Sequence, residues 1–232
     1  RPALLLVALA ATFSRSWFAL GAGWLIARAL LERPRRVWRL GLSAALVLAY
    51  VAVSHVGLVW SEKDRRALRL HVGGPPLACL GSDGGAPCVY ATVYRFTKAA
   101  SLEAIARTWP WGVGPGRQPE FEAQLKTEGL YPGDMPAYRP HSSYTGVPAE
   151  YGAAGLVGLV VFGAGVVVTT RSLLRRGGEE RVFAARAAGA LAMIAIEALT
   201  TDVMHFRHLF WLVAVVGAHA ANGKQESHPR PE

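Results

Sequence analysis

Hydrophobic residues in this chain are concentrated in long runs rather than at alternating positions. Residues 3–27 contain a single charge, Arg15, and residues 40–60 and 151–170 contain none. A helix needs about 20 predominantly apolar residues to cross the roughly 30 Å hydrocarbon core of a membrane. The three runs therefore predict membrane-spanning helices.

Two further apolar stretches predict additional spans near the C-terminus. Residues 182–201 are interrupted by Arg186 and Glu197, and residues 209–221 are short for a full crossing. Local thinning of the bilayer or polar flanking residues can accommodate a short span. We therefore expect an all-α membrane protein, a polytopic bundle of about five transmembrane helices. Because the sequence starts at Arg1 and soon enters an apolar run, we expect residues 1–232 to be the C-terminal part of one membrane domain.

The positive charge of the chain is concentrated in two short segments. The formal net charge is +9, from 25 Lys and Arg against 16 Asp and Glu. Residues 28–39 contain five arginines and residues 171–181 contain four, each between two apolar runs. Short cytoplasmic loops carry an excess of Arg and Lys, so both segments are predicted to be cytoplasmic. Since topology accounts for the basic excess, we expect no nucleic-acid partner.

Alternation of the spans then places one long loop outside the cytoplasm. Residues 61–149 form this periplasmic loop, and the polar tail 222–232 is expected to be cytoplasmic and disordered. Apolar spacing predicts a helix over residues 90–109 that stops at Pro110. A second short helix is predicted over residues 119–126, with Pro119 at its start. The loop is therefore expected to be partly helical.

Cys79 and Cys88 lie close together in this loop, flanked by glycine and proline. The outer side of a bacterial membrane is oxidising, so a disulfide between them is expected. Two unpaired thiols are the alternative. Neither a histidine nor a further cysteine stands nearby at zinc-site spacing, so we expect no metal here.

Three polar residues near the apolar runs are candidates for chemistry. Arg15 lies near the middle of the first run, where an arginine usually finds an anionic partner or faces a water-filled cavity. It either binds a ligand phosphate or carboxylate, or pairs with an acid such as Glu197. His141, directly before the third run, could take a proton near neutral pH, or it could be an ordinary interfacial histidine. Asp202 follows the fourth run and could orient a base or bind a sugar hydroxyl, or belong to a polar turn.

The order of several motifs resembles the O-antigen ligase and O-antigen polymerase superfamily of bacterial inner membranes. A membrane helix carries Ser14-Arg15, and an outer helix carries Arg95 and leads to Pro110-Trp-Gly-Val-Gly-Pro-Gly116. His141-Ser-Ser-Tyr144 and Pro148-Ala-Glu-Tyr-Gly-Ala-Ala-Gly-Leu-Val-Gly-Leu159 follow. Ser142 departs from the family pattern, in which asparagine is commoner. The glycines at 112–116 lack the Lys-Ser/Thr ending of a nucleotide P-loop.

The resemblance implies a glycosyltransferase that works without a metal or other cofactor. Its donor would be a glycan on undecaprenyl diphosphate, and its acceptor a hydroxyl of lipid A–core, in a membrane that supplies the surrounding lipids. His141 would be the general base, and Arg15 and Arg95 would bind the donor diphosphate. Asp202 would support them. An active site facing the periplasm and inversion at the anomeric carbon are also implied.

Other functions remain open on the sequence alone. Within the superfamily, the acceptor could instead be a growing glycan, as in a polymerase, or a hydroxyl of a protein. Outside it, a non-catalytic transporter or assembly scaffold fits the same apolar runs, although inverted repeats typical of transporters are not evident in this sequence.

Overall fold

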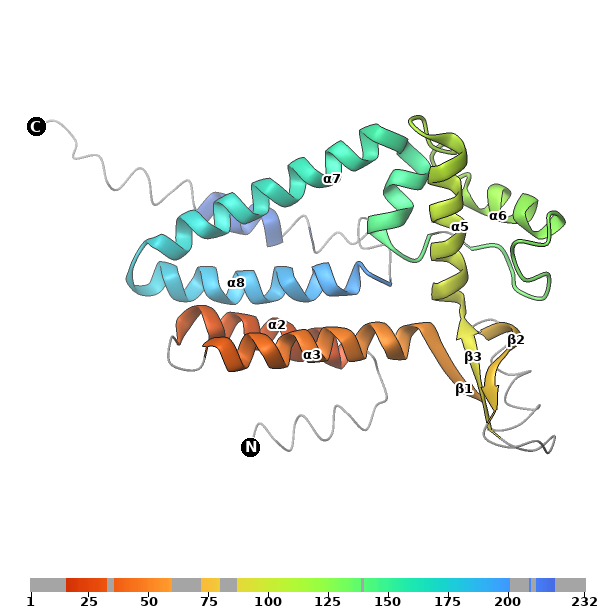
Figure 1. The fold of residues 1–232 in the computed structure, drawn as a ribbon. Helices are drawn as coiled ribbons and strands as arrows, with labels where there is room; N and C mark the ends of the chain where they lie inside the picture. Colours follow the sequence, from red (N-terminus) through yellow and green to blue (C-terminus); the bar gives the residue numbers. More distant parts are fainter. Residues whose placement is uncertain are drawn as a thin grey trace, which may run out of the picture. The chain divides into compact units, whose positions relative to one another are not determined.

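The computed structural model describes residues 16–32, 36–59, 72–79, 87–138, 140–200, 209 and 212–219. These residues are mostly helical and include one small sheet (Figure 1). In chain order the elements are α2 (Ser16–Leu31), α3 (Arg36–His55), β1 (Val56–Val59), β2 (Val72–Cys79), β3 (Cys88–Thr92), α5 (Val93–Thr108), α6 (Gln118–Thr127), α7 (Ser143–Arg175) and α8 (Gly178–Glu197). Residues 212–219 are also helical.

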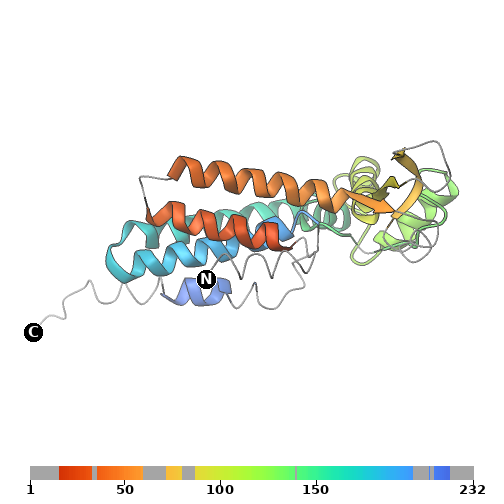
Figure 2. The same ribbon diagram turned by 90° about the horizontal axis from the view of Figure 1, so that it is seen from below.

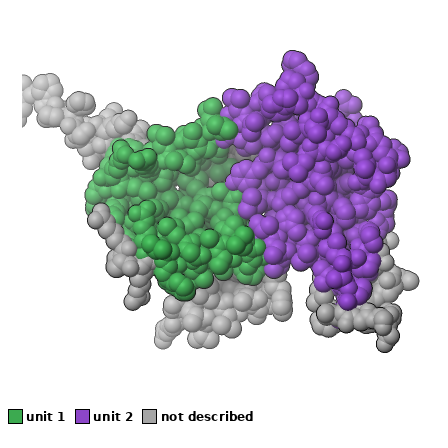
Figure 3. Space-filling view, in the orientation of Figure 1, with its two compact units in different colours: residues 1–50, 160–197, 203–232 green, residues 51–159, 198–202 purple. Residues whose placement is uncertain are grey.

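The chain forms two compact units, which are coloured separately in Figure 3. The first unit consists of residues 1–50, 160–197 and 203–232, and the second of residues 51–159 and 198–202. The predicted periplasmic loop, residues 61–149, falls within the second unit. Helices α3 and α7 each contribute residues to both units.

Two of the described helices, α3 and α7, are long and apolar enough to cross a membrane. They cover the apolar runs at 40–60 and 151–170. Helix α2 contains only a shorter apolar stretch, and α8 carries Glu179 and Glu180 in its first turn. The described residues therefore support membrane association through two candidate spans, rather than the five spans that the sequence predicts. Residues 3–15 of the first predicted span and the tail 222–232 lie outside the described part.

Helices α2 and α8 pack closely in the first unit because two glycines face each other (Figures 1 and 2). A Cβ atom added to Gly189 would lie 2.6 Å from the carbonyl oxygen of Gly23, and one added to Gly23 would meet the carbonyl oxygen of Gly189. Any side chain at either position would push the backbones apart. Small residues of this kind allow close helix packing in lipid.

Polar groups between the helices of the first unit are hydrogen-bonded. The fully buried Tyr50 donates its hydroxyl to Glu197 Oε2 at 2.9 Å, and Ser43 donates to the carbonyl of Ala22 at 3.2 Å. Without water, such groups need protein partners. Glu197, one possible partner of Arg15, thus accepts a hydrogen bond from Tyr50. Arg15 itself lies outside the described residues.

The second unit contains an antiparallel sheet with the strand order β1-β3-β2. Cys79 of β2 and Cys88 of β3 are directly paired across this sheet and form a disulfide bond. The sequence predicts a helix from residue 90 onward. This start is wrong, because Tyr90 belongs to β3, where it packs with Val59 and Val72, and α5 begins only at Val93.

Helices α5 and α6 share an apolar core in the second unit. Phe121 and Leu125 of α6 pack with Ala100 and Ala104 of α5, and Met135 from the following loop joins them. The predicted short helix at residues 119–126 is confirmed as α6, with Pro119 in its first turn, where its missing N–H costs nothing. Tyr94 and Tyr138, which are partly buried, pack against this core.

Candidate functional site

His141 lies between two tyrosine rings in the second unit. Its ring centroid is 5.2 Å from that of Tyr94, on the first turn of α5, and 5.3 Å from that of Tyr138. Both pairs are tilted, which is a favourable arrangement for aromatic rings. The imidazole is only half-buried, so solvent or a substrate can reach it. Aromatic contacts of this kind restrict the orientation of the ring.

The backbone after His141 is anchored to a single carbonyl group. The hydroxyl of Ser142 and the amide of Ser143 both donate to the oxygen of Ala198, each at 3.1 Å. Both serines are almost completely buried. Residues 198–202 and the start of α7 belong to the same compact unit, so this anchor holds His141 at a defined position before the helix.

A buried carboxyl group holds the segment that carries Tyr138. Glu122 of α6 is fully buried, and its Oε2 accepts a hydrogen bond from the amide of Tyr138 at 2.7 Å. Burial raises the pKa of Glu122 to about 7, although the hydrogen bond from Tyr138 opposes this shift. Burial also raises the pKa of the Tyr138 phenol, so that this side chain stays protonated at neutral pH. Tyr138 therefore faces His141 as a neutral phenol.

The first two turns of α5 carry two cations next to Tyr94. Arg95 is exposed and, among the described residues, makes no hydrogen bond or ion pair. Lys98 is half-buried, and burial lowers the pKa of its amine to about 8. The first turn of α5 contains no acid, and Thr92 does not cap it, because its hydroxyl donates to the carbonyl of Ser54 at 2.5 Å. The helix start therefore has positive side chains, no acid and no side-chain cap, an arrangement that suits anions.

Lys98 is oriented by a histidine at the end of α3. His55 Nδ1 lies 2.7 Å from the carbonyl oxygen of Val51, which can only accept, so this nitrogen carries the proton. His55 Nε2 is therefore the acceptor for Lys98 Nζ, at 2.8 Å. The lysine keeps further N–H groups for a ligand, because an ammonium has three donors.

The two glycine-bearing motifs of the sequence are joined through their backbones. The amides of Val113 and Gly114 donate to the carbonyls of Ala149 and Glu150 at 2.8 and 3.0 Å, and the amide of Ala153 donates to the carbonyl of Pro110 at 2.8 Å. Gly152 interrupts α7 with φ 60° and ψ −140°, a conformation that is essentially restricted to glycine. A Cβ atom on Gly152 would overlap the carbonyl of Pro110. The motifs are therefore structural neighbours that join the end of α5 to the kink of α7.

The structure describes four of the predicted site residues, whereas two others lie outside the described part of the chain. His141 and Arg95 both belong to the second unit, where Tyr94 contacts His141 and directly precedes Arg95. Cys79 and Cys88 lie in the sheet of the same unit. The positions of Arg15 and Asp202 lie outside the described residues. Within the described part of the chain, no group of three or more His, Cys, Asp or Glu side chains is arranged to hold a metal ion.

Sequence reasoning missed the aromatic partners of His141 and the cationic residue near Arg95, Lys98. Tyr94 and Tyr138 are separated by more than 40 positions, and only the shared core of α5 and α6 brings them together. Lys98 does carry a signal, since it follows Tyr94 and Arg95 by about one helical turn and would share their helix side. His55 carries none, because it lies at the end of an apolar run.

No family model, curated protein or solved structure matches this chain.

Proposed function

We propose that this protein is a membrane glycosyltransferase of the O-antigen ligase type, which moves a glycan from undecaprenyl diphosphate to an acceptor hydroxyl. One observation carries the proposal: His141 is held beside Tyr94 on the first turn of α5, the turn that also bears Arg95. Such a transfer requires a base for the acceptor hydroxyl and positive groups for the diphosphate, and here both lie on adjoining elements.

His141 would act as the general base. As the acceptor oxygen attacks the anomeric carbon, its O–H bond breaks and the proton passes to a ring nitrogen of His141. The bond from the anomeric carbon to the diphosphate oxygen breaks at the same time, and its electron pair leaves with the diphosphate. Because attack and departure occur on opposite faces, the configuration at the anomeric carbon inverts. This step needs no cofactor.

Arg95 would bind the departing diphosphate together with Arg15. A guanidinium offers parallel N–H donors to phosphate oxygens and stabilises the charge that develops on them. We add Lys98 to this donor site, since its amine lies one turn after Arg95 and is oriented by His55. Asp202 is proposed as a supporting acid.

The same proposal places the protein in the bacterial inner membrane, as a multi-pass protein with its active site facing the periplasm. Helices α3 and α7 support a membrane location through their length and apolar composition. The disulfide between Cys79 and Cys88 supports an oxidising compartment for the second unit. Lipid A–core is the favoured acceptor, and a growing glycan or a protein hydroxyl is the alternative.

Glycan transfer in membranes that contain the full-length protein tests this proposal. The donor is an undecaprenyl-diphosphate glycan, supplied either with lipid A–core or alone. We expect transfer to lipid A–core, and we expect His141→Ala to lower its rate by about 10²–10⁴-fold, the usual contribution of a general base. Arg95→Gln is expected to raise the donor concentration needed for half-maximal rate.

His219→Gln is the matched control, because His219 also contacts an aromatic ring, that of Phe183, but belongs to the first unit. It should leave transfer unchanged. Chain lengthening with donor alone would indicate a polymerase that uses the same base. Substantial activity of His141→Ala would refute the base assignment, and the absence of transfer to lipid A–core, glycan or protein acceptors would refute the glycosyltransferase proposal.

A further inference from the structure

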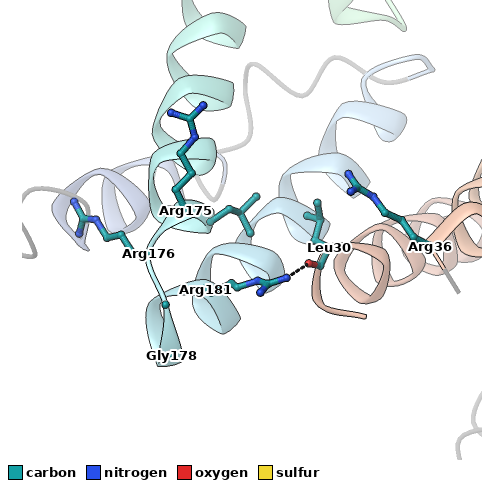
Figure 4. A pocket seen from close by; sticks show the side chains of 8 residues that line it. Leu30, Arg36, Arg175, Arg176, Gly178 and Arg181 are labelled. Carbon is teal, nitrogen blue, oxygen red and sulfur yellow. Dashed lines mark hydrogen bonds between the residues drawn. The ribbon is translucent and has the colours of Figure 1, made fainter. Parts of the chain in front are cut away.

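A cavity of about 530 Å³ lies in the first unit where α7 turns into α8 (Figure 4). Four arginines line it, together with apolar and glycine residues. Arg36 begins α3, Arg175 ends α7, Arg176 lies in the turn and Arg181 lies in the first turn of α8. The start of α3 and the turn from α7 to α8, which are distant in sequence, therefore both contribute arginines to the lining of one cavity.

A tight glycine turn builds the cavity. Gly178 has φ 57°, which L side chains rarely adopt, and it allows α8 to start only three residues after α7 ends. Leu173 of α7 then packs with Ala184 and Ala187 of α8. On the other side, Arg181 donates to the carbonyl of Leu30 at 3.1 Å and so joins α8 to the end of α2 (Figure 4).

The cavity has more positive charge than its neighbouring acids neutralise. Arg176 lies 3.3 Å from Glu180 and forms an ion pair with it. Glu32, the nearest acid to Arg36 in the described sequence, is already bound by Arg28 and Arg39.

Arg36 and Arg175 pair with no acid among the residues that the structure describes, and both are exposed. Their guanidinium groups are therefore available to an anion that enters the cavity.

The surface next to the cavity is apolar. Val37 and Trp38, which follow Arg36, are 86% and 69% exposed, and Leu30 and Leu174 contribute to the lining. Tryptophan beside arginine is typical of the membrane–water interface. A ligand that fits this place combines an anionic oxygen group with a hydrocarbon part, which distinguishes a lipid from a soluble anion.

We propose that this arginine pocket binds the phosphodiester headgroup of an anionic phospholipid, with Arg36 and Arg175 as its main contacts. Guanidinium groups suit phosphate because they donate two parallel hydrogen bonds. Basic pockets between membrane helices bind acidic headgroups in the same way. The proposal requires that α3 and α7 span the membrane, but it does not depend on glycosyl transfer.

Native mass spectrometry of the delipidated full-length protein in detergent tests this site. Dioleoyl phosphatidylglycerol is the anionic probe and dioleoyl phosphatidylcholine the zwitterionic one. We expect the unsubstituted protein to bind phosphatidylglycerol more tightly. The double variant Arg36→Gln/Arg175→Gln should weaken that binding roughly thirtyfold, as expected when two arginines lose their contribution at a membrane surface. Neither side chain makes a hydrogen bond or an ion pair with the described residues, so folding should be preserved.

The matched control is Arg171→Gln/Arg186→Gln, which removes the same charge from exposed positions on α7 and α8 outside the pocket. Its affinity for phosphatidylglycerol should change little. An equal loss in this control would overturn the proposal in favour of general surface attraction. Equal binding of both lipids would also overturn it. Competition by inorganic phosphate or glycerol 3-phosphate at millimolar concentration would show a site for soluble phosphate instead.

Discussion

Glu122 illustrates how a single side chain can make the stability of the second unit depend on pH. Its carboxyl group ionises near 4.5 in an unfolded chain, and burial raises its pKa to about 7 in the fold. Between these pH values the folded state binds more protons than the unfolded state. The free energy of unfolding therefore falls as pH rises from about 4.5 to about 7.

Replacing Glu122 with glutamine should remove this dependence. Glutamine has nearly the same shape, can still accept the hydrogen bond from the Tyr138 amide and never ionises. We expect Glu122→Gln to be more stable relative to the unsubstituted protein at pH 8 than at pH 5. Thermal unfolding in detergent at the two pH values measures the difference. Glu120→Gln, which removes an exposed ion pair with Arg117, should show no such pH dependence. An identical difference at both pH values would contradict the prediction.

The residues of the candidate site were easier to predict from the sequence than the side chains that contact them. The resemblance of the motifs singles out Arg95 and His141, but Tyr94 and Tyr138 are ordinary amphipathic residues in sequence. Their contacts with His141 depend on the packing of α5 against α6 and the hydrogen bond from Tyr138 to Glu122. Such contacts arise from tertiary structure, which no local pattern encodes.

At the scale of elements, the kink of α7 is the most constrained feature. Gly152→Ala should strongly destabilise the protein, because the added Cβ would overlap the carbonyl of Pro110 at the point where the two glycine motifs join. Forcing a non-glycine residue into such a conformation costs of order 1–3 kcal/mol before any overlap is counted. Gly158→Ala, on the same helix with open space around it, should be neutral or slightly stabilising.

Thermal unfolding of both variants in the same detergent measures this contrast. Equal midpoints for Gly152→Ala and Gly158→Ala would contradict the proposed constraint. If the two motifs support His141, Gly152→Ala should also lower transfer activity at temperatures where the variant remains folded.

The helices of the second unit were easier to predict than its strands. Apolar spacing indicated α5 and Pro119 indicated α6. By contrast, β2 has the sequence Val-Gly-Gly-Pro-Pro-Leu-Ala-Cys, whose glycines and prolines are depleted in strands. Its pairing with β3 is irregular between Gly73 and Ala78, and direct pairing resumes at Ala78, next to the disulfide-bonded Cys79. Strand β2 therefore depends on its pairing with β3 rather than on the strand propensity of its own residues.

At the scale of the whole molecule, the proposed orientation can be tested by labelling single cysteines. In a Cys79→Ser/Cys88→Ser background, Ala123→Cys introduces an exposed thiol on α6 and Gly177→Cys one in the turn after α7. The arginine-rich turn is expected inside and the second unit outside. A membrane-impermeant maleimide should therefore label Ala123→Cys in intact spheroplasts, and Gly177→Cys only after lysis.

The background without introduced cysteines should stay unlabelled in both conditions. Labelling of Gly177→Cys before lysis, or of Ala123→Cys only afterwards, would reverse the orientation and remove the periplasmic location of His141. This result would be independent of whether the transfer assay detects activity.

The facing glycines of α2 and α8 also determine how late in synthesis the contact between these helices can form. Gly189 is translated roughly 165 residues after Gly23, which at about 5–20 residues per second corresponds to about 8–33 s. Throughout this interval the small-residue side of α2 lacks the helix that it packs against in the finished protein. The contact between α2 and α8 must therefore form late, so that a chain arrested before α8 emerges would leave Gly23 open to contact with other helices.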